Sequence, residues 1–200
     1  MKPIQSCLAA MALSTTSLLS SNLVADTAVF AGGCFWCVEK DFEALPGVSE
    51  AISGFSGGTA EDPTYQGDHT GHYEAVEITY DPALVSYEEL LAHFWVNIDP
   101  FDDKGQFCDK GPSYLSAIFV ADEQERMLAE QSRQEVIARF PDMTVATPIL
   151  QADTFYPIKG REIHHQVAPS LAHHHLLTIT EISLLIQRDS FRPGSDRQPG

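Results

Sequence analysis

The sequence predicts a two-layer α/β (α+β) domain in which helices pack on one mixed or antiparallel sheet. Short β-prone runs alternate with stretches whose apolar residues recur every three or four positions. Their order along the chain is strand, helix, strand, strand, helix, strand, helix, strand. The chain has 200 residues, of which 44% are hydrophobic, so it can bury one sizeable core and we expect a single globular domain.

Three elements are expected over residues 27–55, namely a strand, a helix and a second strand. Residues 27–31 form a short apolar β-prone run that ends in Gly32 and Gly33. From Cys34 onward, apolar side chains recur at helical spacing as far as a Pro-Gly pair, which predicts an amphipathic helix directly after the strand. Residues 48–55 favour a second strand, because they are followed by two further glycines.

The second half of the domain continues the same alternation. A polar loop over residues 59–72 precedes an alternating run at 73–80, which predicts a third strand. Ser86 begins a capping box, and an apolar helical pattern follows it. The remaining elements are a strand, a helix and a strand over residues 114–120, 122–140 and 143–150.

The two ends of the chain differ from its centre. Lys2 is followed by an uncharged run up to Ala25, which predicts a secretory signal peptide over 1–25 and an exported protein, periplasmic or secreted. Polar residues interrupt this run, so it favours a transmembrane helix less. We expect the folded domain at 26–157 and a divergent, disordered tail at 158–200, where no element pattern continues.

The composition is strongly acidic. The formal net charge is −16, and the loss of Lys2 with the signal peptide makes the mature chain −17. A field of that sign repels phosphate backbones and anionic lipid surfaces. Neither nucleic acid nor a membrane is therefore expected as a partner of the mature protein.

Cysteine usage indicates thiol chemistry rather than a disulfide scaffold. Cys7 lies in the predicted signal peptide, which leaves Cys34, Cys37 and Cys108, an odd number. Cys34 follows a strand and two glycines at the expected start of a helix, where free backbone N–H groups and the helix dipole lower the pKa of a thiol. The sequence therefore predicts a nucleophilic thiolate at Cys34.

Cys37, three residues further on, leaves several functions open. A Cys-x-x-Cys pair suits thiol–disulfide cycling, as in a general thioredoxin-like dithiol oxidoreductase, or half of a zinc site in a binding module. Zinc needs four ligands, and a lone pair of this kind is a weak zinc signal, so we expect no metal. The ligands that could complete such a site are Cys108 and one of His69, His72 or His93.

Aromatic and polar residues near these cysteines are the other candidates. Phe35 shares the apolar stripe of the helix, whereas Trp36 lies off it and is better placed to form an exposed apolar wall for a methyl group. Glu74 lies at the start of the alternating strand, an edge position, where partial burial would raise its pKa and make it a proton donor. Taken alone, all four polar candidates are more typical of turn or surface residues, namely Tyr65, Glu74, Asp109 and Tyr114.

Five motifs occur in order between residues 27 and 157. They are Ala31-Gly-Gly-Cys-Phe-Trp-Cys-Val-Glu39, Gly54-Phe-Ser-Gly-Gly58, Pro63-Thr-Tyr65, Thr70-Gly-His-Tyr-Glu-Ala-Val76 with Tyr80-Asp-Pro82, and Asp109-Lys-Gly-Pro-Ser-Tyr114 with Ser116-Ala-Ile-Phe119. Together they resemble the A-type peptide methionine sulfoxide reductases, and the ordered set is far more specific than any one motif. The resemblance implies an α/β roll with a ferredoxin-like arrangement, in agreement with the element order above.

The resemblance also implies a role for each candidate residue. Cys34 attacks the sulfur of methionine S-sulfoxide and becomes a sulfenic acid, while Phe35 and Trp36 form the pocket for the methyl group. Glu74 protonates the sulfoxide oxygen. Tyr65 and Tyr114 donate hydrogen bonds to that oxygen, and Asp109 supports the polar network. A second thiol then forms a disulfide with Cys34, and a thioredoxin-like dithiol reduces it.

The implied partners are this reductant and oxidised proteins, with no metal or organic cofactor, and we expect a monomer. The second thiol is Cys37 or Cys108. Cys37 is favoured by its proximity in sequence, although it shares a helix with Cys34, and a disulfide there needs local adjustment. Cys108 remains open because it precedes Asp109, which the resemblance places at the active site.

The sequence departs from the family pattern in two places. The loop between Tyr65 and Glu74 is short. After Pro157, the acidic, tyrosine-rich segment of the family is replaced by Ile-Lys-Gly-Arg-Glu-Ile-His-His-Gln166. A frameshift near Pro157 and true divergence both explain this. The nucleotide sequence of the gene separates them, because only a frameshift leaves the expected segment in another reading frame.

Overall fold

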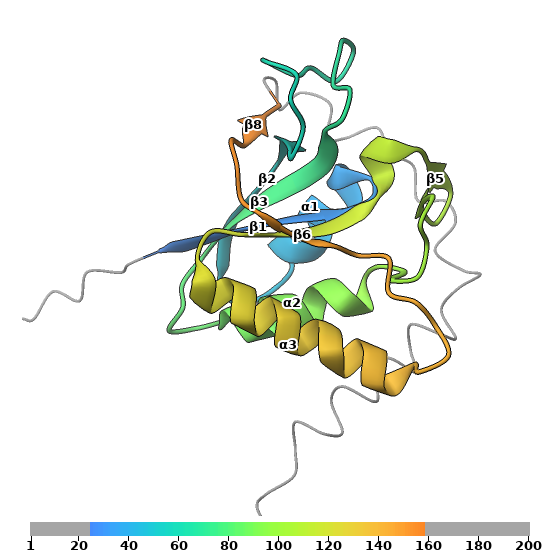
Figure 1. Ribbon diagram of the computed structural model, residues 1–200. Helices are drawn as coiled ribbons and strands as arrows, with labels where there is room; N and C mark the ends of the chain where they lie inside the picture. The colour runs from blue at the N-terminus through green and yellow to red at the C-terminus, as the bar shows by residue number, and fades with distance from the viewer. Residues whose placement is uncertain (1–24, 159–200) are drawn as a thin grey trace, which may run out of the picture.

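A six-stranded sheet forms the centre of the molecule (Figure 1). The computed structural model describes residues 25–158. The predicted signal peptide, apart from Ala25, and the predicted tail, apart from Ile158, therefore lie outside the described residues. The strands of the sheet are β1 (Asp26–Gly32), β2 (Val48–Ser56), β3 (Tyr73–Tyr80), β6 (Ser116–Val120), β7 (Ile149–Gln151) and β8 (Tyr156–Pro157).

The strands lie in the order β7-β6-β1-β3-β2-β8. All neighbouring pairs are antiparallel except β6 and β7, which are parallel, so the sheet is mixed. The four longer central strands, taken with the two helices that connect them, have the ferredoxin-like order. The predicted two-layer roll is thus confirmed.

Among residues 25–158, three α-helices pack on the sheet, namely α1 (Phe35–Glu43), α2 (Tyr87–Val96) and α3 (Glu123–Arg139). Figure 1 shows α2 and α3 side by side below the sheet. The predicted capping box starts α2: the Ser86 hydroxyl accepts the Glu89 N–H at 3.2 Å, and the Glu89 carboxylate accepts the Ser86 N–H at 2.8 Å. Asp122 caps α3 by accepting the Glu125 N–H at 2.9 Å.

Phe30 is the centre of the core on the helix-covered face of the sheet. It is fully buried, and its ring stacks on Phe42 of α1 at 5.4 Å and on Phe94 of α2 at 5.1 Å between centroids. The opposite face carries small residues, including Ala31 and Ala117, and Phe155 packs against it. In Figure 1 the chain that leads from β7 to β8 crosses this face.

Two predicted strands are shorter than expected. The strand predicted at 114–120 begins only at Ser116, because Pro112 starts a 3₁₀ turn that includes Tyr114. The strand predicted at 143–150 is limited to β7, because Pro148 precedes it and the Ala146 N–H donates to the Pro100 carbonyl instead of a sheet neighbour.

Glu39 of α1 is a charged residue that is nevertheless buried, whereas Lys40 beside it is exposed. Its carboxylate accepts the N–H of Ser53 at 2.8 Å and also the Ser53 hydroxyl. These bonds tie α1 to β2 and satisfy a backbone donor of that strand. Spacing alone could not reveal this exception, because the partner lies in another element.

Within residues 25–158, no helix is both long enough and apolar enough to cross a membrane.

Candidate active site

Cys34 lies at the junction between β1 and α1, where it is the N-cap residue of the helix. Gly33 before it has a φ of 90°, a left-handed conformation that residues with a Cβ rarely adopt. The Cys34 carbonyl accepts the N–H groups of Cys37 and Val38 at 3.0 and 3.3 Å, which starts the helical pattern. The residue is half-buried and carries a free thiol. Cys34 is therefore at the start of a helix, as the sequence predicted.

The surroundings of Cys34 favour its thiolate. A hydrogen bond from the Cys37 thiol is the main cause that lowers the pKa of Cys34 to about 6, against the opposing effect of burial. Backbone N–H groups of Cys37 and Trp36 lower it further, whereas the negative charge of Asp109 raises it. The same hydrogen bond raises the pKa of Cys37, which therefore keeps its proton. One thiolate and one neutral thiol face each other.

Glu74 lies near one end of β3, opposite Phe55 of β2. As the sequence predicted, it lies at the start of its strand, and the β1–β3 pairing begins only at Val76, yet the Glu74 side chain is only 3% exposed. Its carboxylate accepts the N–H of Phe35 at 3.2 Å. Burial raises the pKa of Glu74 to about 7, and the charges of Cys34 and Asp109 add to this, while the Phe35 N–H opposes it.

Aromatic rings line the space beside Cys34. Phe35 is fully buried and Trp36 half-buried, as expected from their positions on and off the apolar stripe. The ring of Tyr65, which is 39% exposed, lies 5.0 Å from Trp36 and 6.0 Å from Phe35 between centroids. The loop that carries Tyr65 thus packs against α1, and the three rings form an apolar wall with a phenol at its rim.

Tyr114 and Asp109 lie close enough to the same centre to interact with it electrostatically. The charge of Glu74 is the main cause that raises the pKa of Tyr114. Burial raises the pKa of Tyr65, and the charge of Glu74 adds to it. Asp109 is exposed, yet its charge raises the pKa of both phenols as well as that of Cys34. The fold therefore brings together residues that lie up to 80 positions apart in the chain.

Cys108 is near this group but is not joined to it. It lies at the exposed turn of a hairpin formed by β4 (Gly105–Gln106) and β5 (Asp109–Lys110), and its thiol is free. In the described part of the chain, the thiol in hydrogen-bond contact with Cys34 is that of Cys37. Over the same residues, no group of three or more His, Cys, Asp or Glu side chains is arranged to hold a metal ion.

Comparisons with known proteins identify the family. A family model described as peptide methionine sulfoxide reductase matches residues 26–183. The chain belongs to this family. It is 50% identical over 146 residues to the peptide methionine sulfoxide reductase MsrA 2 of Caulobacter vibrioides, covering 72% of this chain and 73% of the relative. MsrA of Bacillus subtilis is 45% identical over 144 residues, covering 70% of this chain and 81% of the relative.

Solved structures agree with this assignment. Methionine sulfoxide reductase A of Corynebacterium diphtheriae superposes with a TM-score of 0.62 at 30% identity, covering 75% of this chain and 79% of the other. Reduced Mxr1 of Saccharomyces cerevisiae has the same fold, with a TM-score of 0.62 at 22% identity over 74% and 89% of the two chains. The predicted activity, thiol-dependent reduction of the (S)-sulfoxide of peptide methionine, is confirmed by the family.

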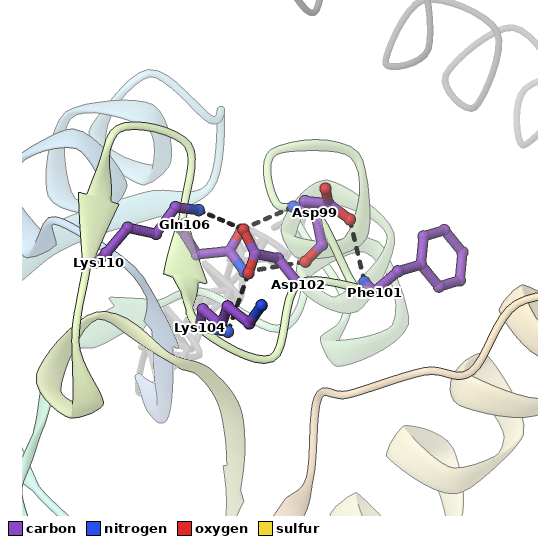
Figure 2. Close-up of polar contacts among 6 residues, drawn as sticks. All are labelled: Asp99, Phe101, Asp102, Lys104, Gln106 and Lys110. Atoms are coloured by element: carbon purple, nitrogen blue, oxygen red, sulfur yellow. Dashed lines mark hydrogen bonds and ion pairs between the residues drawn. The ribbon is translucent and has the colours of Figure 1, made fainter.

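Gln106 is a buried polar residue of this reductase that sequence reasoning missed. It is 1% exposed, and Figure 2 shows its amide bonded to the backbone of Asp99 within a loop that also contains the Asp102–Lys110 ion pair. A glutamine in a Gly- and Asp-rich loop is ordinarily exposed, and strands of two residues have no periodicity. The sequence therefore contains no signal that distinguishes Gln106 from a surface residue.

Proposed function

We propose that Cys34 is the nucleophile of the sulfoxide reduction and Glu74 its proton donor. The observation that carries this assignment is the contact at Phe35. The N–H of Phe35, the residue after the nucleophile, donates to the Glu74 carboxyl at 3.2 Å. A thiol with a pKa of about 6 and a carboxyl with a pKa of about 7 thus flank one reacting centre, and near neutrality they coexist as thiolate and acid.

The first step transfers the sulfoxide oxygen to Cys34. The thiolate attacks the methionine sulfur and forms an S–S bond, a proton from Glu74 goes to the oxygen, and the S–O bond breaks. The released hydroxide then attacks the Cys34 sulfur, and the electron pair of the S–S bond returns to the methionine sulfur. Methionine leaves and Cys34 becomes a sulfenic acid. The phenols of Tyr65 and Tyr114 donate hydrogen bonds to the oxygen as its negative charge develops, and Asp109 supports this polar group.

The substrate methyl group fits the apolar wall of Phe35, Trp36 and Tyr65. Trp36 offers the larger accessible surface, because it is half-buried, whereas Phe35 is the fully buried part of the wall. An apolar wall on one side and proton donors on the other would hold a tetrahedral sulfoxide in one orientation. This arrangement supports a preference for one epimer at sulfur.

The second step forms a disulfide between Cys37 and Cys34. The Cys37 sulfur attacks the sulfenic sulfur, and the hydroxyl leaves as water with the proton of the thiol. The hydrogen bond between the two thiols supports Cys37 over Cys108 as the resolving cysteine. A dithiol of the thioredoxin type would then reduce the disulfide, which is accessible because Cys37 is exposed. A yeast protein of the same fold, Mxr1, has been solved in complex with Trx2.

We further propose that the folded unit, residues 26–157, acts as an exported monomer without a metal or organic cofactor. The named groups all come from one chain, and the proposed steps use only thiols, a carboxyl and two phenols. The run from Lys2 to Ala25 supports a cleaved signal peptide and a periplasmic or secreted location. Amino-terminal sequencing of protein recovered from outside the cytoplasm tests this: an intact Met1 there would contradict cleavage.

Reduction of a defined sulfoxide tests the chemical assignment. Purified protein with dithiothreitol should reduce methionine S-sulfoxide in a peptide and leave the R epimer. Cys34→Ser should abolish the activity, because a hydroxyl of ordinary pKa replaces the thiolate. Cys108→Ser is the matched control and should keep the first turnover. Full activity in Cys34→Ser would contradict the proposal.

A further inference from the structure

Gln106 is a buried amide that joins the nucleophile turn to a hairpin through direct contacts. Its Oε1 accepts the N–H of Asp99 at 2.7 Å, and its Nε2 donates to the carbonyl of the same residue at 2.9 Å (Figure 2). Both polar groups of one backbone residue are thereby satisfied by one side chain. Such a paired contact fixes the orientation of the amide as well as its distance from the loop.

The opposite side of Gln106 packs on the backbone beside Cys34. A Cβ placed on Gly33 would lie 2.5 Å from the Cβ of Gln106, closer than side-chain atoms approach one another. Gly33 also has a φ of 90°. The backbone that delivers the nucleophile therefore rests directly on this glutamine, with no intervening side chain.

Gln106 also fixes the strand that carries Asp109. The two residues are partners in the β4–β5 ladder. The Gly111 N–H donates to the Lys104 carbonyl at 2.8 Å, and the Asp102–Lys110 ion pair closes the base of the hairpin. Because Asp109 lies close enough to raise the pKa of Cys34, a shift of the hairpin changes the charge that the sulfur experiences.

We propose that Gln106 is a positioning residue for the sulfoxide reduction, which holds the Gly33–Cys34 turn and the Asp109 strand in a fixed relation. It touches neither substrate nor sulfur. It acts by keeping the Cys34 sulfur over the N–H groups of the first helical turn, and the Phe35 N–H on Glu74. The inference rests on the proposed role of Cys34.

Alkylation of Cys34 tests this without relying on sulfoxide chemistry. The rate of reaction with iodoacetamide is followed by peptide-resolved mass spectrometry between pH 4 and 9, in the full chain, for the wild type and Gln106→Met. Methionine keeps the volume that packs on Gly33 but loses both bonds to Asp99. We expect the pH midpoint to rise and the rate at pH 6 to fall about tenfold, because donors must be aligned to stabilise a thiolate.

Gln151→Met is the matched control. The Gln151 amide also forms a hydrogen bond with the backbone, because it donates to the Val120 carbonyl at 2.9 Å. Gln151, however, lies on β7, away from the cysteines. It should leave the midpoint and rate of Cys34 alkylation unchanged. With S-sulfoxide peptide, Gln106→Met should lower kcat about tenfold and change KM less, because the aromatic wall is built from other elements.

The outcomes separate the possibilities. A Gln106→Met protein that unfolds more readily but alkylates Cys34 with the wild-type profile would show a merely structural role and overturn the inference. If this variant does not fold, Gln106→Asn is measured instead. Its side chain keeps an amide but is too short to reach the same contacts, and a wild-type alkylation profile would again overturn the inference. Retained reductase activity in Cys34→Ser would refute the proposed nucleophile instead, and the alkylation profiles would be unaffected by that result.

Discussion

The two sides of the active site differ in their access to water. On one side, Glu74 is 3% exposed and Phe35 is fully buried. On the other, Cys37 and Cys108 are exposed, and Phe107 at the hairpin turn is 43% exposed. Cys34 lies between the two sides and is half-buried. Within α1 the nucleophile is thus followed by a fully buried residue, Phe35, and by an exposed one, Cys37.

This difference matches the two halves of the catalytic cycle. Proton transfer to the sulfoxide oxygen benefits from burial, because burial raises the pKa of Glu74 and keeps its proton available near neutrality. Disulfide exchange instead requires that a second protein approach the sulfur atoms. Variants on the buried side should impair the first turnover, whereas variants on the exposed side should impair only the recycling.

The largest effect is expected from Glu74→Gln on the buried side. The amide keeps the size of the side chain but has no acidic proton, so the first-turnover rate should fall about a hundredfold or more. Rapid-quench measurement of methionine formed per enzyme, without reductant, checks this. Glu77→Gln is the control, because Glu77 lies on the same strand but points to the other face. A first turnover equally fast in both variants would remove Glu74 from the mechanism.

A different pattern is expected from Cys37→Ser on the exposed side. The hydroxyl can still donate a hydrogen bond to the Cys34 thiolate, so the first turnover should remain. Sustained turnover with a thioredoxin-type dithiol should fall about tenfold, because the sulfenic acid must then await an intermolecular thiol. Cys108→Ser serves as the comparison. Should Cys108→Ser instead stop the recycling while Cys37→Ser does not, the resolving role belongs to Cys108.

Smaller effects are expected from the phenols at the boundary between the two sides. Tyr65→Phe and Tyr114→Phe should each lower kcat about fivefold, since each removes one hydrogen bond worth about 1 kcal/mol. Tyr73→Phe, whose ring packs on Phe119, is the control. Steady-state kinetics with peptide sulfoxide measures all three. An unchanged kcat in both Tyr65→Phe and Tyr114→Phe would mean that neither hydroxyl contacts the oxygen.

The sequence alone predicted only part of the buried side of the active site. A short apolar β-prone run predicted β1, periodicity predicted α1 and β3, and the glycines before Cys34 predicted its place at a helix start. Partial burial of Glu74 was expected from its place at the start of a strand, whereas its nearly complete burial depends on neighbouring elements such as β2 and α1, which the sequence of one strand does not encode. Tyr65 and Tyr114 lie in turns and Asp109 in a strand of two residues, and only the family resemblance identified them as candidates.

The exposed side was less predictable for a physical reason. The hairpin strands have two residues each, too few to display an alternating pattern. Their conformation depends on tertiary contacts, such as the Gln106 bonds to Asp99 and the packing on Gly33. Glu39 is a parallel case, because its burial depends on donors from Ser53 in another strand.

The pH dependence of the first turnover tests most directly whether a thiolate and a protonated carboxyl act together. The rate should rise with pH as Cys34 loses its proton near a pKa of about 6, and fall as Glu74 loses its proton near a pKa of about 7. The wild-type profile should therefore be bell-shaped, with its maximum between these values. In Glu74→Gln the fall at higher pH should disappear. A wild-type rate that stays constant from pH 7 to 9, or the same fall at high pH in Glu74→Gln, would contradict the account.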